Sequence, residues 1–387
     1  MLILGGDGYL GWPTAMYLSA RDHKVTVVDS MVKRRWEAEV DAAPLFAAPT
    51  LQHRVATWER LTSRRIECHV FDIATNAARL YRLFDDFQPD AVVHYAEQPS
   101  APFSMIDRAR TIETQINNIS ATLNVAYAMK HQGGTCHLIK LGTMGEYGTP
   151  NIAIEEGWLD VVHEGRPDRV LFPKRPGSFY HLSKVHDSHN LEFMARVWGL
   201  AVTDLNQGVV YGTGTDETAL SSELGTSFHY DAVFGTVVNR FVCQAAIGEP
   251  LTVYGQGGQT RGYLNIRDTL RCVELAIMNP APRSTFRVFN QFTEQFTVTE
   301  IASLVTEAAT SVGLATSVRH LENPRKESEA HFYHAKNSGL LALGLKPHLL
   351  TVDVLTEMIE VVRQHRELVD RGKLPPRVTW ESQREVK

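Results

Sequence analysis

A glycine-rich turn at residues 5–11, with the sequence GGDGYLG, limits the folds that this chain can adopt. It satisfies both G-x-G-x-x-G and G-x-x-G-x-x-G, and it stands between an apolar strand and a helical pattern. Glycines in that setting permit a tight turn, let the backbone approach a pyrophosphate and let the helix pack closely on the strand. The turn therefore predicts a βαβ unit that binds a dinucleotide. The alternative is a turn that only packs a helix on a strand.

The first two hundred residues continue this alternation of short apolar runs and longer helical patterns, which is typical of a parallel sheet. Candidate strands are Leu2–Leu4, Val25–Asp29, Glu67–Asp72, Ala91–Tyr95, His137–Leu141 and Val202–Asn206. Long amphipathic helices are expected over Thr111–His131 and Tyr180–Trp198. We therefore predict an α/β fold of Rossmann type, a doubly wound parallel sheet with a smaller C-terminal substrate-binding domain.

The length of 387 residues suits two domains, at about 150 residues for a typical domain. We place a dinucleotide-binding domain at 1–210 and a mainly substrate-binding domain at 211–387, with segments near 232–247 and 262–280 as candidates for returning to the first. Residues 149–178 are rich in proline, glycine and charge, which predicts a long functional loop. Further helices are expected over Val298–Val312 and, as a solvated amphipathic cover, over Val352–Arg371.

Composition excludes several classes of function. The net charge of −5 argues against a general binder of nucleic acid or of anionic membranes, and no stretch approaches the ~18 apolar residues of a spanning helix. The four cysteines lie far apart, without a C-x-x-C pair, so no metal site is expected. The first residues already read as a buried strand, which leaves no room for a leader peptide. We expect a soluble protein of the cytoplasm.

An acidic residue at the end of the second strand indicates which dinucleotide is bound. Asp29 stands 18 residues after Gly11, where a carboxylate holds a ribose diol and repels a 2′-phosphate. This favours NAD over NADP, although Lys33 and Arg34 could weaken the preference or serve the pyrophosphate or adenine. Cofactor contacts are expected from Gly5, Gly8, Tyr9, Leu10, Gly11, Asp29, Ser30, Lys33 and Arg34, with Asp72 and Ile73 flanking the adenine.

A tyrosine and a lysine one helical turn apart provide a candidate catalytic base. Tyr180 and Lys184 stand at i and i+4 on one helix face. A tyrosine is a poor base at its free pKa of about 10, and a neighbouring cation can lower that pKa. Thr143, at the end of the fifth strand, offers a hydroxyl that could share the substrate's proton. The alternative is a purely structural Tyr/Lys pair.

These motifs, in this order, resemble the extended short-chain dehydrogenases/reductases that act on nucleotide sugars. Longer stretches resemble the UDP-sulfoquinovose synthase family, which makes the donor of the sulfolipid head group. They are Ser104–Arg108, His137–Pro150, Ser178–Asn190, Thr203–Gly212, Tyr254–Tyr263 and Phe289–Phe296, and the similarity runs nearly to Trp380.

The resemblance implies a hidden redox cycle on UDP-glucose with NAD as cofactor. C4 is oxidised with Tyr180 as base, supported by Lys184 and Thr143; water then leaves from C5/C6, sulfite adds at C6, and C4 is reduced again. In the related 4,6-dehydratases an Asp-Glu pair follows the threonine, whereas Met144 and Gly145 stand here. Glu146 and His181 are the candidates for elimination and addition, and a hydrogen-bonded helix histidine is the alternative for His181.

Further contacts carry over from the resemblance, each with an ordinary surface residue as the alternative. Asn117 and Gln207 would contact cofactor or sugar, and arginines suit diphosphate oxygens. The UDP would be held by Asn239, Arg240, Thr252, Val253, Tyr254, Gln259, Arg261 and Arg325. The two long helices imply a homodimer formed through a four-helix bundle.

One position departs from the family. The segment after the fourth strand reads Glu-Gln-Arg-Ser-Ala-Pro in the family, and Pro99 stands here in place of the arginine. Proline removes a charge and a backbone donor, for which Arg108 or Arg175 could compensate. The alternatives are therefore a 4,6- or 5,6-dehydratase or a 4-epimerase without sulfonation, and a non-catalytic NAD(H)-binding protein.

Overall fold

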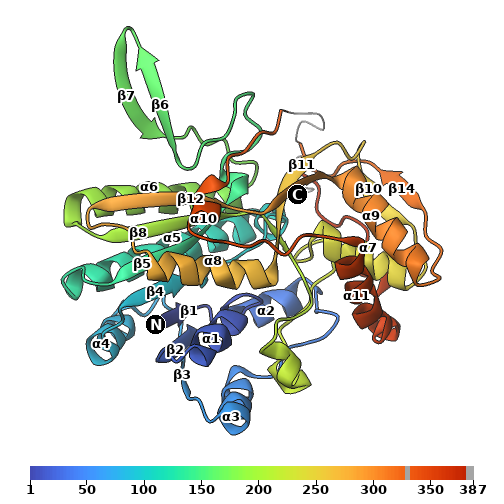
Figure 1. The fold of residues 1–387 in the computed structure, drawn as a ribbon, viewed down its shortest axis with the longest axis horizontal. Coiled ribbons are helices and arrows are strands. Elements are labelled where there is room, and N and C mark those ends of the chain that lie inside the picture. The colour runs from blue at the N-terminus through green and yellow to red at the C-terminus, as the bar shows by residue number, and fades with distance from the viewer. Residues whose placement is uncertain (327–331, 381–387) are drawn as a thin grey trace.

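Seven parallel strands form the main sheet, in the order β12-β8-β5-β4-β1-β2-β3 (Figure 1). The computed structural model describes residues 1–326 and 332–380. The strands are β1 (Leu2–Leu4), β2 (Val25–Asp29), β3 (Ile66–Val70), β4 (Ala91–His94), β5 (His137–Thr143), β8 (Ala201–Gln207) and β12 (Thr285–Gln291). The order reverses between β1 and β4, and doubly wound sheets bind ligands at that point of their carboxyl edge. The predicted α/β fold of Rossmann type is confirmed.

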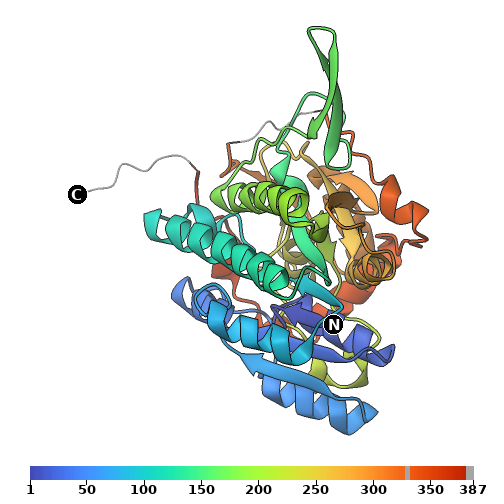
Figure 2. The same ribbon diagram turned by 90° about the vertical axis from the view of Figure 1, so that its left-hand side faces the viewer.

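Helices cover both faces of this sheet, because successive strand residues point to opposite sides. Leu2 and Leu4 pack in one hydrophobic cluster and Ile3 in the other. The first cluster includes residues of α4 (Ala77–Phe87), α5 (Arg108–His131) and α6 (Phe179–Trp198). The second includes residues of α1 (Gly11–Ala20), α3 (Leu51–Thr62), α8 (Ile266–Met278) and α10 (Ser338–Ala342). Figure 2 shows α5 and α6 side by side.

A smaller unit stands beside the carboxyl edge of the sheet (Figure 1). Its core gathers buried side chains of α7 (Val237–Ala246), α9 (Val298–Ser311) and α11 (Val352–Arg363), among them Phe241, Val305 and Ile359. Its strands are β10 (Leu251–Tyr254) with β14 (Val318–Leu321), and β9 (Val209–Tyr211), β11 (Thr260–Asn265) and β13 (Glu294–Thr297). Of the segments near 232–247 and 262–280, the first contains α7 of this unit and the second contains α8 of the main sheet.

The predicted loop at 149–178 contains a β-hairpin of its own. β6 (Trp158–His163) and β7 (Arg166–Leu171) pair antiparallel and project from the body of the molecule (Figure 1). Glu164 and Gly165 join them, both with positive φ (49° and 76°). Two such residues in a row match the twist of a two-residue hairpin turn.

Some element limits differ from those expected. The third strand is Ile66–Val70 rather than Glu67–Asp72, and α2 covers Val32–Glu39. The helix expected over Val352–Arg371 ends at Arg363, because the amide of His365 bonds the carbonyl of Val362 in the tighter i→i−3 pattern. Short 3-10 turns lie at Phe103–Met105, Met144–Glu146, Thr218–Leu220, Ser222–Leu224, Arg366–Leu368 and Arg371–Lys373. Within the described residues, no helix is long and apolar enough to cross a membrane.

Candidate active site

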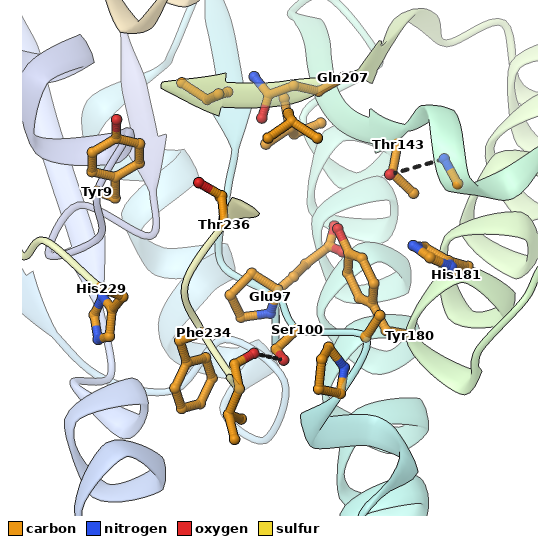
Figure 3. Close-up of a pocket in the computed structure, with 18 of the residues that line it drawn as sticks. Tyr9, Glu97, Ser100, Thr143, Tyr180, His181, Gln207, His229, Phe234 and Thr236 are labelled. Carbon is orange, nitrogen blue, oxygen red and sulfur yellow. Dashed lines mark hydrogen bonds between the residues drawn. The ribbon is translucent and has the colours of Figure 1, made fainter. Parts of the chain in front are cut away.

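A cavity of about 1090 Å³ opens at the carboxyl edge of the main sheet (Figure 3). Its walls come from the loops after β1, β2, β3, β4, β5 and β8, from the start of α6 and from the smaller unit. It therefore lies where the strand order of the sheet places a ligand.

The cofactor half contains the glycine turn, which leaves no room for a side chain at Gly5 or Gly11. A Cβ on Gly11 would lie 1.9 Å from the carbonyl oxygen of Gly5, and one on Gly5 would lie 2.7 Å from the amide nitrogen of Ala96. Gly5 has a φ of +89°, which residues with a side chain rarely adopt. Gly8, Tyr9 and Leu10 also line the cavity. The bare backbone at the start of α1 fits a pyrophosphate, so this part of the chain fits a dinucleotide.

Asp29 is held rigidly at the end of β2. Its carboxylate accepts hydrogen bonds from the backbone amides of Asp7 (2.9 Å) and Met31 (2.7 Å). Burial, together with the nearby charge of Asp7, raises the pKa of Asp29 to about 6. Asp29 and Ser30 line the cavity, so an ionised carboxylate is available to ribose hydroxyls above that pH.

Both basic residues of the cofactor half have acidic partners. Arg34 binds the carboxylate of Asp7 through Nε (2.8 Å) and Nη2 (2.9 Å). Lys33 pairs with Glu37, and its ammonium lies 3.1 Å from Nε2 of His229. Both cations line the cavity, but each already forms an ion pair with a carboxylate of the protein. These ion pairs weaken the attraction of the two cations for a 2′-phosphate. Asp72, Ile73 and Asn117 line the same half.

The start of α6 fixes the candidate base. The hydroxyl of Ser178 caps the helix by accepting from the amide of His181 (3.1 Å), and the amide of Tyr180 donates to the hydroxyl of Ser104 (3.0 Å). Tyr180 and His181 line the cavity with Thr143 (Figure 3). The hydroxyl of Thr143 accepts from the amide of Gly145 (3.2 Å). Its hydrogen is therefore left to donate to a ligand.

Lys184 stands behind Tyr180 rather than on the cavity wall. Its ammonium lies 5.9 Å from the centre of the Tyr180 ring, donates to the carbonyl of Leu141 (2.7 Å) and pairs with Glu97. Burial and the charge of Glu97 raise the pKa of Tyr180 above its ordinary value. The resting tyrosine therefore holds its proton.

Amide and guanidinium side chains line the substrate half of the cavity. Arg240 donates to the carbonyl of Thr252 (3.1 Å) and stacks over the Tyr254 ring at 4.3 Å. The side chain of Gln207 donates to Gln291 (3.1 Å). The predicted residues that line this half are Gln207, Asn239, Arg240, Tyr254, Gln259, Arg261 and Arg325. Thr252 and Val253 lie outside the wall, because β10 buries their side chains.

The sequence of the chain matches the profile of the NAD dependent epimerase/dehydratase family over residues 1–290. It is 52% identical over 380 residues to the chloroplastic UDP-sulfoquinovose synthase of Spinacia oleracea, covering 98% of this chain and 79% of that protein. It is 40% identical over 390 residues to the UDP-sulfoquinovose synthase of Sulfolobus acidocaldarius, covering 100% and 99%. The chain belongs to the NAD dependent epimerase/dehydratase family, as a homologue of the UDP-sulfoquinovose synthases.

A solved structure shares the fold of this chain. The UDP-glucose 4-epimerase of Bifidobacterium longum, in complex with NAD⁺ and UDP, superposes with a TM-score of 0.67 at 19% identity, covering 94% of this chain and 97% of that one. At that identity the likeness concerns the fold alone.

Glu146, a family-based candidate for elimination, lies behind the cavity wall. Its side chain is fully buried and forms ion pairs with Lys140 (3.4 Å) and Lys174, and it accepts from Ser188 (3.0 Å). Burial opposes its ionisation, but the two lysines outweigh it and lower the pKa of Glu146. Because Lys174 directly precedes the cavity-lining Arg175, Glu146 anchors a wall segment and does not reach the substrate space.

His181, the other family-based candidate for elimination, does line the cavity. Burial, with Arg325 and Arg261 nearby, lowers the pKa of the His181 imidazole to about 3. The ring is therefore neutral, and its Nδ1 is buried without a hydrogen-bond partner. Such a ring can exchange a proton with a ligand in the cavity.

Pro99, where the family resemblance leads us to expect an arginine, also lines the cavity. Of the two arginines that could replace that charge, Arg175 lines the cavity and Arg108 is exposed at the start of α5. Of the two, Arg175 is the one that the fold brings to the cavity.

Sequence reasoning missed several residues of the wall. Glu97, Ser100, His229, Phe234 and Thr236 line it (Figure 3). Glu97 follows β4, and a carboxylate directly after a parallel strand was a usable signal. The residues from 227 to 237 carried none, because they belong to an irregular segment between the two units.

Proposed function

We propose that this chain is a UDP-sulfoquinovose synthase: it oxidises C4 of UDP-glucose transiently, removes water across C5 and C6, adds sulfite at C6 and reduces C4 again. The observation that carries the proposal is that Thr143 and Tyr180 share one cavity with the glycine turn. This occurs in a chain 52% identical over 380 residues to a UDP-sulfoquinovose synthase.

The cofactor assigned to this site is NAD. The glycine turn would hold its pyrophosphate, Asp29 its adenosine ribose, and Asp72 with Ile73 its adenine. When bound, NAD supplies the hydride acceptor and donor for C4. The matched charges of Arg34 and Asp7 support NAD over NADP.

After its own proton has left to solvent, the Tyr180 phenolate accepts the proton of the C4 hydroxyl, and Thr143 donates a hydrogen bond to the same oxygen. Lys184 supplies a fixed positive charge behind the ring. Gln207, at the end of β8, and Asn117, on α5, lie on the same cavity and orient sugar or cofactor.

His181 is the group we assign to elimination and addition. Once C4 is a ketone, the C5–H bond is acidified; His181 takes that proton and returns it to the C6 hydroxyl, which leaves as water, and a 5,6-double bond forms. Sulfite, entering as hydrogen sulfite, then forms the C6–S bond, and its proton goes to C5. The sum is UDP-glucose plus hydrogen sulfite giving UDP-sulfoquinovose plus water. Arg175 is the cation we assign to sulfite.

The UDP is assigned to the arginines of the substrate half. Arg240, Arg261 and Arg325 line one side of the cavity, and guanidinium groups bind diphosphate oxygens bidentately. Asn239, Tyr254 and Gln259 would frame the uracil and ribose. Thr252 and Val253 are part of the core that supports this face.

The proposed assembly is a homodimer through α5 and α6. These helices lie side by side (Figure 2). They expose large apolar side chains, including Ile116, Tyr127, Phe193 and Val197. Exposed apolar surface of this kind marks an interface. Light scattering of the purified chain should give twice the chain mass, and replacing Phe193 and Val197 by glutamate should give a monomer.

The proposed location is the cytoplasm. All four cysteines are free thiols, three of them buried, as is typical of a reducing compartment. The spinach relative is named as a chloroplastic enzyme. Fractionation of the source cells would distinguish a cytoplasmic location from an organellar one.

Mass spectrometry of the product tests the function directly. Purified protein is incubated with UDP-glucose and NAD⁺, with and without sulfite. The proposal expects a sulfonated UDP-hexose only when sulfite is present. A product lighter by one water in both samples would instead favour a dehydratase, the alternative that Pro99 raises. Pro99→Arg should increase sulfite-dependent turnover if the lost charge limits it.

A further inference from the structure

Glu97 is held in place from two sides. Its amide donates to the carbonyl of Tyr95 (2.8 Å), and the next amide, of Gln98, donates to the side chain of Asn118 (2.7 Å). Asn118, on α5, also donates to the hydroxyl of Ser183 on α6 (2.9 Å). One buried amide side chain therefore ties the Glu97 segment to the helix that carries Tyr180 and Lys184.

The carboxylate of Glu97 meets the ammonium of Lys184. Both side chains are almost fully buried, at 2% and 3% exposed, and Lys184 has one further bond, to the carbonyl of Leu141. A buried ammonium without an acidic partner is costly. In the described part of the chain, Glu97 is the acidic residue in ion-pair contact with Lys184.

Other titratable groups surround the pair. His94, 3.6 Å from Glu97, stays neutral because burial and the cations Lys184 and Lys140 lower its pKa to about 3. Burial and the charge of Glu97 raise the pKa of Asp187 well above its ordinary value. Further charged groups that face the site are Lys140 on β5, Glu146 in the turn after β5, Asp204 on β8 and Lys174. Lys140 pairs with both Glu146 and Asp204, Lys174 pairs with Glu146, and the hydroxyl of Ser188 bonds both carboxylates.

Glu97 also reaches the cavity. It lines the wall at the end where Tyr180 stands, and Figure 3 shows both side chains directed to the same space. The other acidic residues of the described wall, Asp7, Asp29, Glu37 and Asp72, lie in the cofactor half. Glu97 is thus the carboxylate placed to act on the catalytic pair.

We propose that Glu97 is the positioning residue of the catalytic pair: its carboxylate holds the Lys184 ammonium behind Tyr180 and cancels the lysine's charge at the phenol. The inference rests on the proposed function, in which Tyr180 is the base. Without Glu97, the lysine would act unopposed and favour the phenolate. With Glu97, the tyrosine keeps its proton in the resting site.

The pH profile of NADH formation tests this, measured in a single turnover of UDP-glucose on NAD-loaded protein. Glu97→Gln keeps the shape and removes the charge, so the acid limb should move to lower pH by about one unit. Lys184→Met leaves the carboxylate unopposed, so the limb should move to higher pH. A merely structural role would not produce opposite shifts. Glu97→Asp retains the charge and should keep the wild-type limb.

The control is Glu274→Gln, which removes a partly buried, ion-paired carboxylate on α8, away from the cavity. Its profile should match the wild type. A Glu97→Gln profile that overlays the wild type, at equal or uniformly lower rate, would overturn the inference. If the wild type itself forms no NADH, the proposed function fails instead. The inference is then tested by following the phenolate absorbance of Tyr180 against pH, after the spectrum of Tyr180→Phe has been subtracted. In Glu97→Gln the Tyr180 phenol should ionise at lower pH than in the wild type. Titration curves that coincide would overturn the inference.

Discussion

The imidazole of His181 occupies the space that a side chain at position 145 would need. A Cβ built on Gly145 would lie 2.3 Å from Nε2 of His181. This links two facts that are separate in the sequence. The position after Met144 is a glycine, and the residue after Tyr180 is a histidine with a bulky ring. The imidazole ring of His181 therefore fills the volume that a side chain at position 145 would otherwise occupy.

Gly145→Ala should therefore displace the His181 ring. The methyl group cannot fit beside it, so we expect a stability loss of about 1–3 kcal/mol and a fall in product formation of about tenfold or more. NADH formation should fall less, because Tyr180 and Thr143 are not moved. Urea unfolding and product analysis measure the two effects. The double variant Gly145→Ala/His181→Ala should recover stability without recovering product; recovery of both would exclude His181 from the chemistry.

Tyr180→Phe should abolish NADH formation on UDP-glucose. The change removes the hydroxyl that accepts the proton, and general base catalysis typically contributes about 10²–10⁴ in rate. The phenyl ring fills the same space, so NAD affinity should stay within about threefold. Single-turnover absorbance measures the first quantity and calorimetry the second. Undiminished turnover in this variant would exclude the assigned mechanism.

The parts of the site that were predictable follow from local patterns. The glycine turn, Asp29 and the i, i+4 pair of Tyr180 and Lys184 each depend on neighbours in the sequence. The order of strands and helices followed from the same kind of pattern. These features lie on the cavity or directly behind it.

The other parts depend on contacts between distant segments. Nothing in the local sequence of Glu146 indicates that Lys174, 28 positions later, turns its carboxylate away from the substrate. Glu97 and Lys184 likewise meet only in the folded chain. Asn118 on α5 links the segment after β4, which carries Glu97, to α6, which carries Lys184. The hairpin at Glu164 and Gly165 was hidden in a segment whose composition is that of a loop.

Glu146→Gln should destabilise the fold and loosen the cavity wall. Removing this charge leaves Lys174 buried without its ion-pair partner and leaves Lys140 with Asp204 alone, and breaking a buried pair typically costs about 3–5 kcal/mol. The lysines lower the folded-state pKa of Glu146, so its contribution is complete above the unfolded value of about 4.3 and is lost as pH falls toward the folded value. The gap in unfolding free energy between wild type and variant should therefore narrow in acid. A pH-independent gap would contradict this account. KM for UDP-glucose should rise, because Arg175 adjoins Lys174.

NAD affinity should depend on pH through Asp29. Burial and the nearby charge of Asp7 raise the pKa of this carboxyl to about 6, so it is protonated below that pH and ionised above it. The ionised form accepts hydrogen bonds from both ribose hydroxyls, and a hydrogen bond to a charged group contributes about 1.5–3 kcal/mol. The Kd for NAD, measured by calorimetry, should thus rise about tenfold or more as pH falls through 6.

Asp29→Asn distinguishes titration of Asp29 from a general loss of NAD affinity caused by acid destabilising the protein. The variant has no carboxyl to titrate, so its Kd should be higher than that of the wild type at neutral pH and nearly constant across the same range. Asp22→Asn, which changes a carboxylate whose side chain is 84% exposed, should retain the full pH dependence. If Asp29→Asn kept the wild-type dependence, another group would have to be responsible, and the ribose contact assigned to Asp29 would have to be withdrawn.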